Sequence, residues 1–264
     1  MIIDFHVHCF ADEIAERAVA SLSQVAGLPP RSDGTVAGIK SSMKKAGIDK
    51  SVLLSIATKP QQTRKITQWA ASVQSEEIIA FGSIHPDSED WEDELVSLYE
   101  AGIIGIKFHP DYQKFYVDDP KMFPIYEKAA ELGLIIVFHA GVDIGLPAPY
   151  HCPPVRMKRV VRAFPGAKIV AAHLGGFDYW DEVEDILAGE KLYLDTSFSL
   201  YKLGKEQFLR IASKHGYDRL LFASDSPWGD QTEEVKRLQS LILPSDIEDA
   251  ILGGNALRLL GLTC

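Results

Sequence analysis

Eight short runs of apolar and β-branched residues recur along the chain, and each is followed by a segment long enough for a helix. Between the last residues of successive runs, the first interval is 49 residues and the other six are 23 to 34. A parallel connection needs at least about a dozen residues, so every interval can hold a helix that returns the chain to the same end of a sheet. The runs are residues 2–8, 51–57, 78–84, 104–109, 134–139, 168–173, 192–196 and 220–225.

Eight strand-and-helix units of nearly constant size predict an α/β fold, a single (β/α)8 TIM barrel. The competing arrangement is a doubly wound open sheet, but the constant spacing favours closure. A barrel of this kind occupies about 250 residues. The 264 residues therefore predict one domain over 1–264 with nothing left for an accessory domain. The long first interval holds more than one crossover helix, and its segment 27–34 is expected as a surface excursion that serves as a lid.

The charge balance bounds the partners of this chain. Lys and Arg number 27 against 37 Asp and Glu, a net charge of -10. Nucleic acids and anionic membranes attract clusters of basic residues, so we expect neither as a partner, and expect a small-molecule substrate instead. Three scattered cysteines, no leader-like N-terminus and no apolar run of ~18 residues predict a reduced, cytoplasmic protein without a membrane span.

Polar residues collect at the ends of five of the predicted strands. In a (β/α)8 barrel, functional groups lie at the carboxyl ends of strands. His6 and His8 are two residues apart, so they share one face of the first strand, and Phe5 and Val7 are expected on the other face, against the helices. The polar strand-end residues are His6, His8, Lys107, His109, His139, His173 and Asp225.

This pattern predicts a metal site. Neutral imidazole is a favoured ligand of zinc and other late divalent metals, and two imidazoles on one strand can contact one ion. A carboxylate and a third imidazole from other strands complete a shell with a position for water. A single strand-end histidine is more often a hydrogen-bonded core residue, but that explanation does not account for several strand ends at once.

Five motifs resemble the amidohydrolase superfamily, within it the amidohydrolase-related branch that includes aminocarboxymuconate-semialdehyde decarboxylase. Together they extend from residue 4 to about residue 256. Many superfamily members carry an accessory β-sandwich, for which this chain has no room. The motifs are Asp-Phe-His-Val-His at 4–8, Phe-His-Ala-Gly at 138–141, Ala-His-Leu-Gly-Gly at 172–176, Phe-Ala-Ser-Asp-Ser-Pro-Trp at 222–228 and Gly-Asn-Ala at 254–256.

The resemblance implies one divalent metal ion, most often Zn2+, held by His6, His8, His139 and Asp225. It also implies that His173 positions and deprotonates the metal-bound water, and that Asp225 takes part in proton transfer. The implied activity is hydrolysis of a small ester, lactone or amide by metal-activated water. The alternatives are a metal-dependent, non-oxidative decarboxylase of a small, for example aromatic, carboxylic acid, and a non-catalytic barrel that binds a metal or metabolite. Members of the branch are often homodimers.

Lys107 has two interpretations. In binuclear branches of the superfamily a strand 4 lysine is carbamylated and bridges two metals; His139 and His173 would then bind the second ion. As a plain cation, Lys107 binds a substrate carboxylate. The motifs match mononuclear members, which favours the second interpretation. An anionic substrate is compatible with this local positive charge.

Four residues in the loops after strands 4 and 5 are expected near the substrate, because these loops select substrates in such barrels. His109 either contacts substrate or caps the backbone near Pro110. Arg156 is an anion clamp or an exposed helix residue. The four residues are His109, Tyr112, His151 and Arg156.

Overall fold

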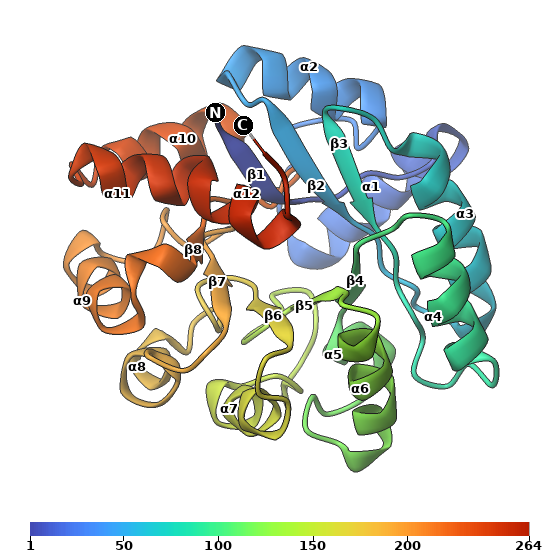
Figure 1. Ribbon diagram of the computed structural model, residues 1–264. Helices are drawn as coiled ribbons and strands as arrows, with labels where there is room; N and C mark the ends of the chain where they lie inside the picture. Colours follow the sequence, from blue (N-terminus) through green and yellow to red (C-terminus); the bar gives the residue numbers. More distant parts are fainter. Residues whose placement is uncertain (264) are drawn as a thin grey trace.

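Eight parallel strands form the centre of the computed structural model, which describes residues 1–263 (Figure 1). Strands β1 to β3 form one sheet and strands β4 to β8 another, each in chain order. The strands are β1 Ile3–Val7, β2 Lys50–Leu54, β3 Ile78–Phe81, β4 Gly105–Phe108, β5 Ile135–Phe138, β6 Lys168–Ala171, β7 Tyr193–Asp195 and β8 Leu220–Leu221.

Backbone hydrogen bonds join the two sheets at both edges. Between β3 and β4, the amide of Lys107 donates to the carbonyl of Gly82 at 2.9 Å. Between β8 and β1, the amide of Phe5 donates to the carbonyl of Phe222, and that of Asp225 to the carbonyl of His6, each at 2.9 Å. These two seams close the sheets into one ring, which confirms the predicted (β/α)8 barrel.

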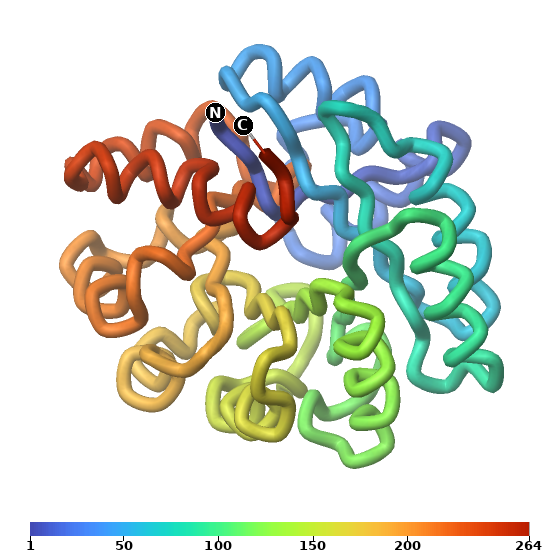
Figure 2. Tube along the Cα trace, in the orientation of Figure 1, coloured from blue at the N-terminus to red at the C-terminus, as the bar shows by residue number. Residues whose placement is uncertain are grey.

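Helices surround the strands, and the chain runs once around the ring so that its first strand lies beside its last helices (Figure 2). Within residues 1–263, no helix combines the length and the apolar character needed to cross a bilayer. The helices are α1 Asp12–Ala26, α2 Val36–Ala46, α3 Thr63–Val73, α4 Trp91–Glu100, α5 Pro110–Gln113, α6 Phe123–Glu131, α7 Pro154–Ala163, α8 Trp180–Glu182, α9 Lys205–His215, α10 Gln231–Gln239, α11 Ser245–Asp249 and α12 Asn255–Leu260. Shorter 3-10 turns are Pro60–Gln62, Pro120–Met122 and Tyr217–Arg219, and π-helical segments are Val183–Leu187 and Ala250–Gly254.

The long first interval contains two helices, α1 and α2, where the other intervals need one. Helix α1 ends at Gly27, whose φ of 66° is left-handed and therefore suits glycine. Helix α2 begins after Thr35, whose side chain accepts a hydrogen bond from the amide of Gly38. Segment 27–34 joins the two helices, and Leu28 of this segment lines the central cavity. Most of the cavity wall in this interval comes from α1 instead of the predicted excursion.

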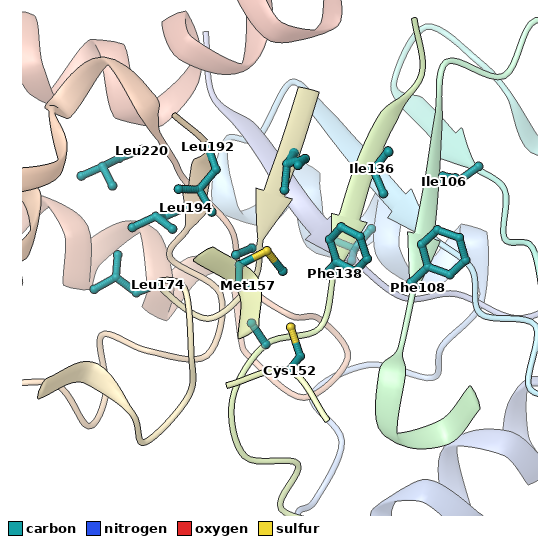
Figure 3. Close-up of a cluster of buried hydrophobic side chains, with 14 of the residues drawn as sticks. Ile106, Phe108, Ile136, Phe138, Cys152, Met157, Leu174, Leu192, Leu194 and Leu220 are labelled. Carbon is teal, nitrogen blue, oxygen red and sulfur yellow. The ribbon is translucent and has the colours of Figure 1, made fainter. Parts of the chain in front are cut away.

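Apolar side chains on the outer faces of the strands pack against the helices. Ile106 and Phe108 of β4 pair in register with Ile136 and Phe138 of β5, and the two phenylalanine rings stack with centroids 5.7 Å apart (Figure 3). Because successive side chains of a strand alternate between faces, Lys107 faces the inside of the barrel.

The first strand departs from simple alternation. Val7 belongs to the outer core, but Phe5 packs inside with Phe81, ring centroids 6.1 Å apart, in the cluster that α12 covers at the amino ends of the strands. The expectation that Phe5 faces the helices is therefore wrong. The physical reason is a register shift between Asp4 and Val7 against β2, which breaks the period of two.

Candidate metal centre

Five of the predicted polar residues lie just beyond the strands, because the strands are shorter than the sequence suggests. His8 follows β1 directly, and His109 and His139 follow β4 and β5. His173 is the second residue after β6, and Asp225 is the fourth after β8. Parallel strands bring these carboxyl ends to one end of the barrel, where all five residues line one cavity with His6 and Lys107.

Three ligand atoms converge at this end. His6 Nε2 and His8 Nε2 are 3.1 Å apart. Asp225 Oδ1 lies 3.4 Å from the first and 3.2 Å from the second. Ligands bonded at 2.0–2.1 Å to a tetrahedral zinc ion lie about 3.3 Å from one another. These three residues, called the triad below, therefore match the spacing of metal ligands.

Hydrogen bonds on the far side of each ring fix the protons of the triad. His6 Nδ1 donates to Asp195 Oδ2 at 3.0 Å, and His8 Nδ1 donates to the carbonyl of Leu54 at 2.8 Å. Because a carboxylate and a carbonyl only accept, each neutral ring keeps its proton on Nδ1 and a lone pair on Nε2. Burial and the nearby charge of Lys107 hold the pKa of His6 well below its usual value, so this ring is neutral.

The triad is therefore a cluster of three facing acceptors. Two imidazole lone pairs and a carboxylate oxygen repel one another at these distances unless a positive charge lies among them. The orientation of the lone pairs and the spacing of the atoms fit a divalent metal ion. His6 and Asp225 are buried, and His8 is half-buried, which limits competition from water.

His139 and His173 form a second ordered chain of protons. His173 Nδ1 lies 3.0 Å from the carbonyl of Ser197, so it carries the proton, and His173 Nε2 accepts from His139 Nδ1 at 3.0 Å. This leaves a lone pair on His139 Nε2, a buried atom without a hydrogen-bond partner among the described residues. Burial, with His109 and His173 close by, lowers the pKa of His139 well below its usual value. His139 Nε2 therefore has the free lone pair that a metal ligand needs.

His139 nevertheless lies apart from the triad. It belongs with His109 and Asp143 to a second group whose ligand atoms are within 4.8 Å of one another, called the His109 group below. The rings of His109 and His139 stack with centroids 4.0 Å apart. His109 Nδ1 accepts from the amide of Tyr112 at 3.3 Å, so its Nε2 carries the proton that points to Asp143 Oδ2 at 3.1 Å. His109 therefore both caps the backbone and lines the cavity, the two readings that the sequence left open.

Lys107 lies beside the triad, with Nζ 3.4 Å from His6 Nε2. Its side chain is almost fully buried, and burial lowers its pKa to about 8 even though Asp195 and Asp225 favour the charged form. Lys107 therefore remains largely an ammonium group near neutral pH. This places a cation next to any substrate that reaches the triad.

Two functional residues were missed from the sequence. Asp195 is fully buried and accepts from His6 Nδ1, from the amide of His173 and from the amide of Ser197, each at 3.0 Å. Its signal was a lone carboxylate at the end of the apolar run 192–196. Asp143 lies in the loop after β5, four residues beyond His139, and no sequence pattern marked it.

Two site residues have left-handed backbone conformations. The φ angle is 58° at His173 and 63° at Asp225. The amide of His173 is held by the Asp195 carboxylate at 3.0 Å, and the amide of Asp225 by the carbonyl of His6 at 2.9 Å. Non-glycine residues keep such backbone angles only where surrounding bonds enforce them, so the β1–β8 seam and Asp195 define where these side chains point.

His151 and Arg156 are not among the described residues that line the cavity. His151 Nδ1 lies 2.7 Å from Asp111 Oδ1. Arg156 forms an ion pair with Asp118 at 2.5 Å and lies over the ring of Tyr116 at 4.1 Å. In this structure the two side chains are engaged with Asp111 and Asp118, apart from the residues that line the cavity. Tyr112, in contrast, lines the cavity as expected.

The sequence matches the model of one protein family over residues 3–262, the family described as Amidohydrolase. The chain belongs to the amidohydrolase family. This confirms the resemblance drawn from the motifs and makes the protein a member of a group of metal-dependent enzymes. Among curated protein sequences, none matches this amidohydrolase at a significant level.

Solved structures similar to this amidohydrolase share its barrel. A TIM-barrel protein of uncharacterized function from Bordetella bronchiseptica is 22% identical, with a TM-score of 0.81 and 98% of each chain covered. A 5-carboxyvanillate decarboxylase from Novosphingobium aromaticivorans, complexed with manganese and a nitrobenzoic acid, is 14% identical, with a TM-score of 0.75 and coverage of 99% of this chain and 96% of that one. A probable 2-pyrone-4,6-dicarboxylic acid hydrolase from Acinetobacter baumannii with bound citric acid is 16% identical, with a TM-score of 0.68 and 99% of each chain covered.

Proposed function

We propose that this amidohydrolase is a hydrolase that cleaves an ester, lactone or amide bond of a small molecule and depends on one divalent metal ion, most simply Zn2+. The observation that carries the proposal is the triad, in which His6 Nε2, His8 Nε2 and Asp225 Oδ1 present three acceptors within 3.1–3.4 Å of one another. A divalent metal held there would polarise a carbonyl group and lower the pKa of a coordinated water to about 7. His139 Nε2 is the proposed fourth ligand, since it is buried and unpaired among the described residues.

Asp225 is the proposed proton acceptor. Burial would raise its pKa, but the contact with His8 and the polar rings of His6 and His173 beside it hold the pKa below its usual value. The carboxylate directs Oδ1 to both histidines of the triad, which leaves its second oxygen to take a proton. Both ring nitrogens of His173 are engaged, by Ser197 and by His139. The geometry thus favours Asp225 over His173 as the base, and His173 orients His139.

Lys107 is proposed to stabilise negative charge on the substrate. The ammonium group lies 3.4 Å from His6 Nε2 and inside the cavity, where a carbonyl oxygen becomes negative as the carbonyl carbon is attacked. A fixed cation in a water-poor site stabilises such developing charge more than the neutral ground state. Carbamylation of Lys107 is the alternative, and it predicts two bound metal ions instead of one.

A decarboxylase is the second candidate. The same Lys107 ammonium is placed to hold a substrate carboxylate. Two decarboxylases share the fold, one of 5-carboxyvanillate and one of 2,6-dihydroxybenzoate. Arg156, the other predicted carboxylate anchor, does not line the cavity. With Arg156 paired to Asp118, the described lining offers fewer anchors for an acid, which favours hydrolysis.

The deciding experiment measures metal and product together. Protein loaded with Zn2+ or Mn2+ is analysed for metal content and incubated with aryl esters, lactones, N-acyl amides and hydroxybenzoic acids, with acid release and CO2 release recorded separately. We expect one metal equivalent and acid release without CO2. CO2 release from an acid would support the decarboxylase, and two equivalents the carbamate. Metal-loaded protein that turns over none of these compounds would contradict both activities and support a binding protein.

The Lys107→Met variant separates the two enzyme hypotheses further. In a hydrolase this variant loses charge stabilisation in the transition state, so kcat falls by about 100-fold with little change in KM. In a decarboxylase that anchors the substrate carboxylate through Lys107, KM rises as well. Metal content of the variant provides the control for an intact triad.

A further inference from the structure

The triad opens into a cavity of about 610 Å³, and the walls of this cavity are largely apolar away from the ligands. Cavities of a few hundred to a thousand Å³ enclose ligands of drug size, which are larger than a single substituted ring. Among the described lining residues the cationic side chains are two lysines, Lys65 and Lys107. Such a wall offers little to a compact polyanion.

One helix provides an ordered apolar strip along this cavity. Ile14, Ala18, Leu22 and Ala26 of α1 are spaced four residues apart and all line the cavity. Residues at this spacing lie above one another on one face of a helix. Ile14 remains 42% exposed, although its side chain is apolar and its neighbours in the strip are not buried either.

The apolar strip is not what holds α1 in place. The buried residues of this helix are Ala15 and Val19. Val19 packs so closely on Gly34 that a β-carbon there would lie 2.4 Å from Val19 Cγ2. The helix is therefore anchored through a different face from the strip. Exposed apolar side chains inside a cavity cost free energy in the absence of a ligand, so the strip is available for an apolar ligand.

Apolar side chains from other parts of the barrel complete this wall. Ile66 and Trp69 of α3 line the cavity, as do Val142 and Ile144 in the loop after β5. Gly145 packs next to the end of α1, where a β-carbon would lie 3.1 Å from Val25 Cγ1. The apolar region is thus continuous with the loop that follows the proposed ligand His139.

We propose that the substrate carries an extended apolar group that lies along the Ile14–Ala18–Leu22–Ala26 strip while its carbonyl reaches the triad. This inference rests on the proposed function and narrows its substrate to esters, lactones or amides with a long aliphatic or multi-ring substituent. The reaction is hydrolysis: the carbonyl carbon forms a bond to the water oxygen, its bond to the leaving oxygen or nitrogen breaks, and the leaving group receives a proton.

Hydroxamic acids test this inference by binding alone, because the hydroxamate group binds metal and the acyl chain can be lengthened. Protein loaded with Zn2+ is titrated by calorimetry with acetohydroxamic, butyrohydroxamic and octanohydroxamic acids. A fully buried methylene strengthens binding about fourfold. For a half-buried chain we expect the Kd to fall at least about 50-fold over the six methylenes from the acetyl to the octanoyl compound.

Two variants on the same helix locate the effect. Ala18→Phe fills the strip. We expect it to reduce the ratio of the acetohydroxamic to the octanohydroxamic Kd, called the chain-length gain here, to below about fivefold. The Kd of acetohydroxamic acid itself is expected to change less than twofold. Ala20→Phe is the matched control, since Ala20 is exposed and does not line this cavity. It is expected to keep the full gain. Leu22→Ala removes contact without adding bulk and is expected to reduce the gain several-fold, which guards against misfolding of the phenylalanine variant.

The outcomes separate this inference from the proposed function. A Kd independent of chain length, or no hydroxamate binding at one equivalent of metal, overturns the inference. An unchanged gain in Ala18→Phe also overturns it, because the chain would then lie elsewhere. Chain-length dependence without hydrolysis of any ester, lactone or amide leaves the apolar ligand class standing and refutes the hydrolase. Hydrolysis of short substrates, without tighter binding of the longer hydroxamic acids, supports the hydrolase and refutes the apolar ligand class.

Discussion

The triad and the His109 group line one cavity and have the same composition, two histidines and one aspartate, but their protons are placed differently. In the triad, both histidines use Nδ1 for bonds to the scaffold, and all three inward atoms are acceptors. In the His109 group, His109 directs its proton at Asp143, so these two residues satisfy each other. The partner on the far side of each ring, not the count of ligands, distinguishes a metal site from a hydrogen-bonded pair.

The largest expected effect follows from removing a carboxylate of the triad. Asp225→Asn replaces an anionic ligand by a neutral amide, and we expect Zn2+ affinity to fall more than about 100-fold, beyond the loss that an outer hydrogen-bond partner causes. Hydrolytic activity is expected to fall in parallel. Competition with a chromophoric chelator measures the affinity. Unchanged affinity with unchanged turnover would remove the triad from the mechanism.

Asp195→Asn tests whether the outer partner sets the proton of His6. The amide can present its NH2 group to His6 Nδ1, which would move the ring proton to Nε2 and block the ligand atom. We expect Zn2+ affinity to fall 10–100-fold, the usual range for such partners. Nuclear magnetic resonance of the histidine nitrogens reports the tautomer directly. Reduced affinity with the Nδ1 proton still present would show that Asp195 acts only through packing.

Glu234 is a buried carboxylate outside both groups and shows what burial does without imidazole partners. Desolvation raises its pKa to about 7, against the opposing effect of Arg237. Because this pKa exceeds the ordinary value of 4.5, Glu234 contributes stability that is complete below pH 4.5 and is lost as pH rises through about 7.

The matched variant is Glu234→Gln, which cannot titrate. Relative to this variant, we expect the wild-type free energy of unfolding to fall by about 3 kcal/mol between pH 4.5 and pH 8. Denaturant titrations of metal-free protein at both pH values measure the difference. Parallel pH profiles for the two proteins would show that Glu234 is ionised throughout, as Asp225 is.

The smallest effect on metal is expected from Asp143→Asn. The substitution weakens a charge-assisted bond to His109 and is expected to cost about 1 kcal/mol of stability. Zn2+ affinity is expected to change less than about threefold, since Asp143 is an outer neighbour of one proposed ligand only. Thermal unfolding measures the loss of stability, and competition with a chelator on the same sample measures the Zn2+ affinity. A loss as large as that of Asp225→Asn would make the His109 group a second metal site.

The sequence predicted the barrel because its eight apolar runs and their spacing are properties of local chain geometry. It also predicted the convergence of His6, His8 and Asp225, since strand ends of a parallel barrel meet at one end. It could not predict the register shift between Asp4 and Val7, which depends on the fit of β1 against β2. Tautomers were equally inaccessible, because they depend on acceptors such as the Leu54 carbonyl that any residue type supplies.

Polar residues outside the recognised motifs were the least predictable part of the site. Arg156 has the chemistry of an anion clamp, and only the structure shows that its guanidinium group already forms an ion pair with Asp118. Asp195 accepts hydrogen bonds from His6 and His173, and Asp143 pairs with His109. In the sequence, however, a lone aspartate resembles any surface carboxylate. Such assignments need contacts between segments far apart in the chain, which no local pattern contains.

The seam between β1 and β8 has a consequence for how the enzyme folds. His6 and His8 come from β1 and Asp225 follows β8, more than 200 residues further along the chain, so no triad exists until these two segments meet and the barrel has closed. Contacts between such distant segments form late, after the entropy of closing a long loop has been overcome. A metal ion held by all three residues would therefore require a closed barrel, and a refolding experiment that follows metal capture would record the moment of ring closure.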